Sequence, residues 1–102
     1  MIQIPLNEET KALAKSLVWF ETPAEALADP VRFLAYAFSR ATHGEMKALR
    51  RYVDDAGLIE ALDNAPPGIV DPRSWAYWNN VLGRYPSPPM PKRRFAEEGR
   101  EA

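Results

Sequence analysis

Signals for the start of a helix recur along this chain and constrain its fold more than any other feature. Thr22-Pro23-Ala24-Glu25 is a capping box, in which the threonine hydroxyl accepts from a first-turn N–H and the glutamate accepts from the threonine N–H. The proline sits where no N–H is needed. Thr42 and Glu45 have the same spacing, while Asp29-Pro30 and Asp71-Pro72 repeat the combination of cap and proline. So many marked starts predict a chain built from short helices.

We therefore expect an all-α fold, a compact irregular bundle of five or six short helices. At the amino end, Asn7 is followed by Glu8 and Glu9, whose negative charges are favourable near a helix start. Asp54 or Asp55 can cap a further helix. The expected helices span residues 8–18, 23–28, 30–41, 43–53, 55–63 and 72–82.

The segment 30–41 is predicted to be the central helix, because apolar residues surround nearly its whole circumference. The segment 43–53 has a narrower apolar stripe, with Met46, Leu49 and Val53 at i, i+3 and i+7. We expect this second helix to cover the central one from one side.

Proline and glycine end the later helices. Two prolines and a glycine at 66–68 stop one helix and permit a sharp reversal, and Gly83 ends the last one. The segment 85–95 begins with four prolines in seven residues, which favours an extended polyproline strap. We expect residues 1–95 to form one helical domain that includes this strap, and residues 96–102 to form a disordered tail.

The most distinctive segment carries two tryptophans. Trp75 and Trp78 are three residues apart, so both indoles point to one face of the helix. In one interpretation they form the core of the domain beneath the strap. In the other, Trp75, Tyr77 or Trp78 stays partly exposed as an anchor for a partner protein, because aromatic and arginine side chains dominate interface energetics. Arg73 and Arg84 flank the segment and fit either an interface or a solvated rim.

The strap also has two interpretations. Residues 86–93 contain P-x-x-P followed by basic residues, a pattern that docks in the aromatic grooves of SH3-type domains. Alternatively, the strap lies on the tryptophan face of its own domain, with Lys92, Arg93 and Arg94 in water and Phe95 as an anchor. The candidate partner-binding residues are Arg73, Trp75, Tyr77, Trp78, Arg84, Tyr85 and Arg93.

The net charge of -1 conceals alternating blocks. Residues 1–30 carry -3, 31–53 carry +4, 54–72 carry -5, 73–95 carry +5 and 96–102 carry -2. Such blocks let neighbouring helices attract each other. A nucleic-acid footprint needs one clustered basic face and usually a high pI, whereas the pI here is about 5.8. Nucleic acid is therefore not the expected partner; the alternative function is a nucleic-acid-binding regulator that uses the basic residues of helix 43–53 or Lys92–Arg94.

No constellation of residues points to catalysis. The chain has no cysteine, which excludes disulfides, thiolate nucleophiles and thiolate-bound metals. His43 and Glu45 form H-x-E, but the P-C-x-x-C that zinc deaminases also require is missing. Asp54, Asp55 and nearby acids fit neither an EF-hand loop nor a phosphate-binding loop. We expect no enzyme, no cofactor and no metal.

Uncharged apolar runs such as Leu17 to Phe20 are far shorter than the ~20 residues that cross a bilayer. The amino terminus also lacks a basic patch followed by an apolar stretch. We expect no membrane partner and a cytoplasmic protein.

Scattered aromatic and cap positions resemble one group of proteins. They are Leu17-Val18-Trp19-Phe20, Asp29 to Leu34, Thr42, Leu49, Leu62 and Arg73 to Trp78. Together they resemble small bacterial proteins encoded beside nucleotidyltransferase-type toxins, which are uncharacterised or antitoxin-like. The resemblance implies a non-enzymatic protein-interaction module whose partner is a protein, such as a toxin. Self-association as a homodimer remains open, and the Pro-rich end from residue 83 onward has no counterpart in this pattern.

Overall fold

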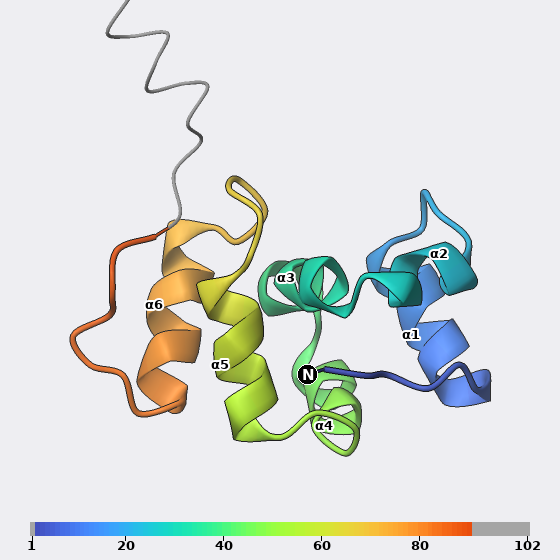
Figure 1. The fold of residues 1–102 in the computed structure, drawn as a ribbon, viewed down its shortest axis with the longest axis horizontal. Coiled ribbons are helices and arrows are strands. Elements are labelled where there is room, and N and C mark those ends of the chain that lie inside the picture. The colour runs from blue at the N-terminus through green and yellow to red at the C-terminus, as the bar shows by residue number, and fades with distance from the viewer. Residues whose placement is uncertain (1, 91–102) are drawn as a thin grey trace, which may run out of the picture.

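The computed structural model describes residues 2–90, and within this range the chain forms six helices and no strand (Figure 1). The helices are α1 Glu8–Leu17, α2 Pro23–Ala28, α3 Pro30–Arg40, α4 His43–Leu49, α5 Asp55–Asp63 and α6 Pro72–Val81. The predicted all-α bundle is confirmed. None of the helices in residues 2–90 has the length and apolar character needed to span a bilayer.

Each helix begins at a cap that the sequence predicts. The Asn7, Thr22 and Thr42 side chains accept from the backbone N–H three residues later, and all three caps form complete capping boxes. Asp29 and Asp71 cap helices that start with proline. Of the two acids considered for α5, Asp54 is the cap; its Oδ1 accepts from the Gly57 N–H at 2.9 Å.

The prediction of a helix over 43–53 was wrong at its end, because α4 stops at Leu49. The following N–H groups bond three residues back, from Arg51 to Ala48 O and from Tyr52 to Leu49 O, so the chain tightens into a turn. The turn delivers Asp54 to the start of α5 and still buries Val53. The predicted apolar stripe therefore reaches the core, but across a turn and not along one helix.

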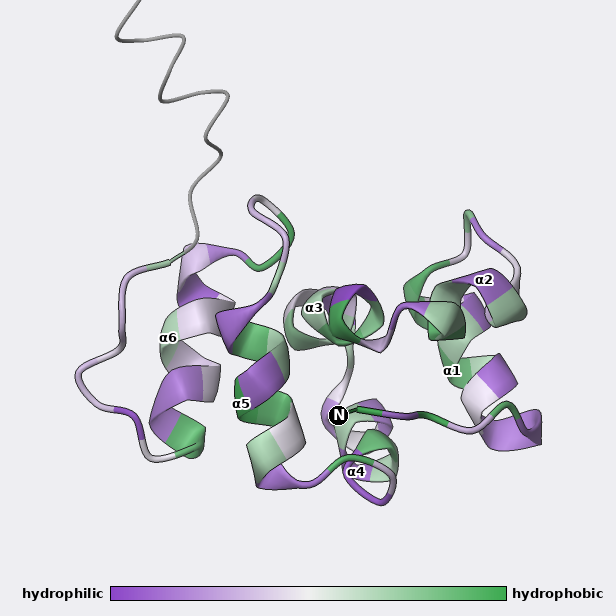
Figure 2. Ribbon diagram, viewed as in Figure 1, coloured by the Kyte–Doolittle hydropathy of each residue, from purple (hydrophilic) through white to green (hydrophobic). Residues whose placement is uncertain are grey.

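The α3 helix lies at the centre of the bundle, as predicted. Figure 1 shows α1 and α2 on one side of it and α5 and α6 on the other, and α3 contacts all four. Its buried residues are Phe33, Leu34, Ala35, Ala37 and Phe38. By contrast, α1, α5 and α6 carry both hydrophobic and hydrophilic residues, as expected for helices that bury one face (Figure 2).

An extended segment precedes α1, and sequence analysis assigned it no structure. Ile2 and Ile4 are buried while Gln3 between them is exposed, the alternation of an extended chain. The fully buried Thr10 anchors this segment, because its hydroxyl donates to Pro5 O at 2.6 Å. The Ile-Gln-Ile pattern was the available signal.

The last helix ends at Gly83, as predicted. This glycine has φ +84°, a left-handed conformation that other residues rarely adopt. The N–H groups of Gly83 and Arg84 donate to Asn80 O and Asn79 O at 3.0 and 2.7 Å, the hydrogen bonds of a Schellman motif. The chain therefore reverses at this point and returns along α6.

The described part of the strap packs on its own domain. The Trp75 indole is 5% exposed, and its Nε1–H donates to Pro88 O at 2.7 Å. Met90 packs against the core as well. The interpretation that places Trp75 beneath the strap is thus correct. The remaining strap residues, 91–95, and the predicted tail 96–102 lie outside the described residues.

Replacing the Trp75 indole with a phenyl ring should destabilise the domain by removing its hydrogen bond to the strap. We expect Trp75→Phe to lower the free energy of unfolding by ~1 kcal/mol more than Trp78→Phe, a matched change at an indole that makes no hydrogen bond within residues 2–90. Urea denaturation monitored by circular dichroism measures both losses. Equal losses would contradict the anchoring role of Trp75.

Candidate protein-interaction site

A groove between α4 and α6 is the most developed surface feature formed by the predicted residues. Two adjacent hollows of about 330 and 300 Å³ compose it, and both are lined by His43, Met46, Tyr77 and Trp78. We call this surface the α4/α6 groove. Its other lining residues are Phe38, Ser39, Ala41, Thr42, Lys47, Arg50, Arg73, Ser74 and Val81.

Contacts between aromatic rings of α3 and α6 form the floor of the groove. Trp78 packs on Phe38 of α3 with ring centroids 5.6 Å apart, so the floor of the groove continues into the core. Tyr77 meets Trp78 edge to face at 5.2 Å. One turn later on α6 comes Val81, which is 43% exposed, while Tyr77 is 57% exposed. A half-buried indole is therefore flanked by two exposed apolar side chains.

The rim of the groove is basic. Lys47, Arg50 and Arg73 line it, and none of its lining residues within the described chain is Asp or Glu. Arg50 is partly neutralised, because its Nη2 donates to Asp55 Oδ1 at 2.6 Å. The geometry combines an apolar floor with positive charge at the edges, which suits a protein segment carrying apolar and acidic side chains.

The predicted partner-binding residues have different positions in the structure. Arg73, Tyr77 and Trp78 line the groove. Trp75 and Arg84 are engaged within the molecule, and Tyr85 is 83% exposed on the strap without lining the groove. Arg93 lies outside the described residues.

The contributions of Met46 and Val81 to this surface were not predicted from the sequence. A signal existed for Val81, because it follows Tyr77 by four residues and so shares its helix face. The sequence contained no such signal for Met46. Its inward position was predicted, but its place opposite Tyr77 and Trp78 in the groove was not. Only the fold, which places α4 across the groove from α6, brings these residues together.

Arg84 joins the ends of α5 and α6. Its Nε and Nη2 donate to Asn79 Oδ1 at 3.0 and 2.7 Å, and its Nη1 and Nη2 reach both carboxylate oxygens of Asp63. Asn79 is fully buried and in turn donates to Trp75 O at 2.9 Å. The role of Arg84 is therefore internal and does not require a partner.

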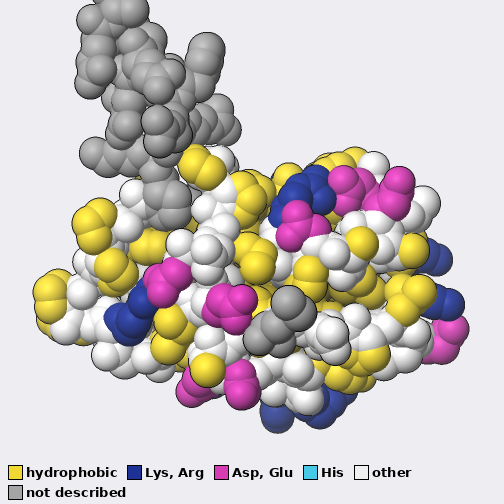
Figure 3. Space-filling view, viewed as in Figure 1, with side chains coloured by type: hydrophobic (Ala, Val, Ile, Leu, Met, Phe, Trp, Pro, Cys, Tyr) yellow, Lys and Arg dark blue, Asp and Glu magenta, His cyan; other side chains and the backbone are white. Residues whose placement is uncertain are grey.

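Two of the bases predicted as alternative contacts for nucleic acid, Arg50 and Arg51, are paired with acids, whereas Lys92–Arg94 lie outside the described residues. Arg51 donates to Glu9, which also accepts from the Tyr52 hydroxyl at 2.5 Å. These bonds, that from Tyr52 first and that from Arg51 second, hold the pKa of Glu9 below its ordinary value of 4.5. Figure 3 shows acidic and basic side chains beside one another at several places on one face. The charge blocks therefore meet across helices, as predicted.

His43 and the acids of α5 have ordinary structural positions. His43 is exposed in the first turn of α4, Asp54 is a cap, and Asp55 and Asp63 pair with arginines. Residues 2–90 contain no group of three or more His, Asp or Glu side chains arranged to hold a metal ion.

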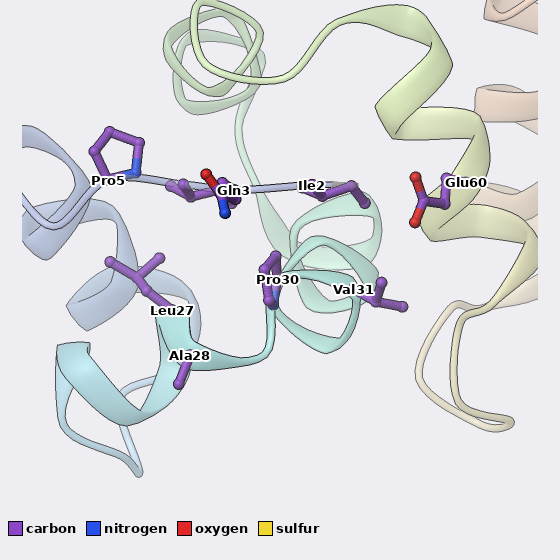
Figure 4. A pocket seen from close by; sticks show the side chains of 9 residues that line it. Ile2, Gln3, Pro5, Leu27, Ala28, Pro30, Val31 and Glu60 are labelled. Carbon is purple, nitrogen blue, oxygen red and sulfur yellow. The ribbon is translucent and has the colours of Figure 1, made fainter.

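A larger hollow of about 690 Å³ lies between the amino-terminal segment, the α2–α3 junction and α5 (Figure 4). Figure 4 shows mostly apolar side chains around it, among them Ile2, Leu27 and Val31. Gln3 and Glu60 are the polar side chains in its lining within the described chain. Because ligand pockets orient their ligands with several convergent polar groups, this hollow is a weaker candidate than the α4/α6 groove.

Comparisons of the chain with protein-family models, curated proteins and solved structures gave no match.

The internal role of Arg84 predicts a clear stability effect. Arg84→Ala leaves the buried Asn79 carbonyl without its donor, so we expect the free energy of unfolding to fall by roughly 1–3 kcal/mol. The control Arg73→Ala removes an exposed arginine at the opposite end of α6 and should change the free energy of unfolding by less than ~0.5 kcal/mol. Similar losses in the two variants, measured by urea denaturation, would refute the assignment.

The lowered pKa of Glu9 predicts how acid weakens the fold. Since the unfolded chain takes up this proton at higher pH, the contribution of Glu9 is complete above its ordinary pKa of 4.5 and is lost as the pH falls through the lower, folded value. Glu9→Gln should therefore lose less stability than the parent chain between about pH 6 and pH 3. Glu45 and Asp71, whose pKa values are also lowered by hydrogen bonds, account for part of the remaining loss.

Urea midpoints measured along this pH series test the prediction. Glu8→Gln is the matched control, because the Glu8 side chain is 97% exposed, and it should keep more of the acid sensitivity of the parent chain than Glu9→Gln does. A Glu9→Gln curve parallel to the parent curve would show that the Tyr52 and Arg51 contacts add nothing.

Proposed function

We propose that this protein is a non-enzymatic protein-interaction module that binds a partner protein through the α4/α6 groove. One observation carries the proposal: Tyr77 and Val81 are exposed on either side of the half-buried Trp78 indole. Aromatic side chains anchored in a core and open to solvent at one edge are typical of binding hot spots. Trp75, the other large apolar side chain of α6, is buried beneath the strap, which concentrates the available apolar surface of this helix in the groove.

The chemistry of the groove favours one kind of occupant. Its floor can receive apolar side chains, and Lys47 and Arg73 on its rim can attract carboxylates. A partner segment with apolar residues on one face and acidic residues beside them satisfies both requirements. This is the occupant that we propose.

The resemblance to proteins encoded beside nucleotidyltransferase-type toxins suggests what that partner is. In this proposal the chain acts as an antitoxin, and the acidic and apolar segment belongs to the toxin. The alternative of nucleic-acid binding has less support, because Arg50 and Arg51 pair with Asp55 and Glu9 and are less available to phosphates.

The test is complex formation with the product of the adjacent reading frame. The full chain and that product, co-expressed and purified, should elute together with a mass by light scattering equal to one copy of each or a small multiple. Val81→Asp should weaken the complex by roughly tenfold or more, because it places a carboxylate on the apolar floor. Circular dichroism should show that the variant stays folded, since Val81 is exposed.

Ala12→Asp is the matched control. It introduces the same charge at an exposed alanine of α1, at the other end of the molecule from α6 (Figure 1), and should leave the affinity unchanged. Failure to form a complex, equal effects of the two variants, or a homodimer in place of the mixed complex would each overturn the proposal.

A further inference from the structure

A second group of aromatic and arginine side chains lies in the turn between α1 and α2 and on the adjoining face of α3. We call Trp19, Phe20, Arg32, Tyr36 and Arg40 the Trp19 cluster. The Trp19 and Phe20 rings meet edge to face with centroids 5.3 Å apart, and Phe20 meets Tyr36 in the same way at 5.6 Å. None of these residues lines the α4/α6 groove.

Arg40 is held within this cluster by three rings and one hydrogen bond. Its guanidinium carbon lies 4.6 Å from the Tyr36 centroid, 4.9 Å from that of Trp19 and 5.8 Å from that of Phe20. Its Nη1 donates to Leu17 O at 2.9 Å, which ties the turn to α3. Arg40 is thereby fixed in place, yet most of its five N–H donors remain available.

Two aromatic rings of the cluster, Trp19 and Phe20, expose a large part of their apolar surface to solvent. Trp19 is 68% exposed and Phe20 is 49% exposed, although the neighbouring Leu17 and Val18 are buried. Side chains that are ordered before binding lose little conformational entropy on binding, and tryptophan, tyrosine and arginine are the residues enriched at hot spots. The cluster therefore has the composition and the order of a binding surface.

The charges around the cluster select the class of partner. Arg32 pairs with Glu21 at 2.9 Å, whereas Arg40 has no carboxylate partner within residues 2–90. Glu25 in the first turn of α2 and Asp29 at its C-cap add negative charge on the adjoining helix. These five side chains sum to -1, so a polyanionic nucleic acid would meet more repulsion than attraction, while a single carboxylate can pair with Arg40 at short range.

We propose that the Trp19 cluster is a second interaction surface, which binds a peptide segment of another protein that presents one carboxylate beside an apolar side chain. The carboxylate accepts from the free N–H groups of Arg40, and the apolar side chain rests on the exposed Trp19 and Phe20 rings. This surface does not depend on the α4/α6 groove, and a partner could use either or both.

Selection from a phage-displayed library of random dodecapeptides against the full chain tests this surface directly. The selected peptides should be enriched in Asp or Glu next to Phe, Trp or Leu. Their affinity, measured by calorimetry, should fall by roughly tenfold or more with Trp19→Ala, with Arg40→Gln, and when the peptide's acid is replaced by its amide. Because Trp19 is exposed, Trp19→Ala keeps the test valid if Arg40→Gln loosens the turn.

Val81→Asp is the control, since it disables the groove and should leave these affinities unchanged. Selection of peptides without acidic residues, or affinities that Trp19→Ala does not alter, would overturn the inference. Tighter binding of a single-stranded oligothymidine than of the selected peptides, abolished by Trp19→Ala, would overturn it in favour of nucleic acid. A complex that depends on Val81 but not on Trp19 would leave the proposed groove standing and remove only this surface.

Discussion

The packing of α3 among four other helices is the constraint on which the remaining structure depends. Phe33 and Leu34 are fully buried, and α1, α2, α5 and α6 contact the helix from different directions. Each fully buried large apolar side chain contributes on the order of 1.5–3 kcal/mol, so this one helix supplies a large share of the driving force for folding. The outer helices need to bury only one face each, which leaves their other faces free to carry binding residues.

The same arrangement decides which aromatic side chains stabilise the fold and which remain available. Trp75 lies under the strap with its N–H satisfied, and Trp78 packs on Phe38 with one edge open. Trp19 lies outside the core, because α1 ends at Leu17 and residues Trp19 and Phe20 belong to an exposed turn that leads to the cap of α2 at Thr22. Amino-acid composition alone cannot distinguish the buried and half-buried tryptophans from the exposed one, since the difference depends on where each helix ends.

Local signals made the helix starts predictable, and long-range packing made the surfaces unpredictable. Cap residues act on N–H groups within three positions, so Thr22, Thr42 and Asp71 identified their helices without knowledge of the fold. The end of α4 depends on a turn that presents Asp54 to α5, and a continuous apolar stripe does not reveal it. The Trp19 cluster joins a turn to α3 and the α4/α6 groove joins separate helices, and one sequence contains no signal for such pairing. The residues of the candidate site on α6 were therefore predictable from the sequence, whereas the α4 residues that face them across the groove were not.

The two surfaces lie on opposite sides of one helix, and this geometry bears on how they could act together. Tyr36 and Arg40 are one turn apart on α3, whereas Phe38, midway between them, points the other way and supports Trp78. A tightly packed helix between two sites keeps their separation constant and transmits little rearrangement when one site is occupied. Binding at the two surfaces should then be energetically independent, as expected for sites that share no contacts. A single partner that spanned both would gain affinity through effective concentration, and its binding would be sensitive to the distance between its two segments.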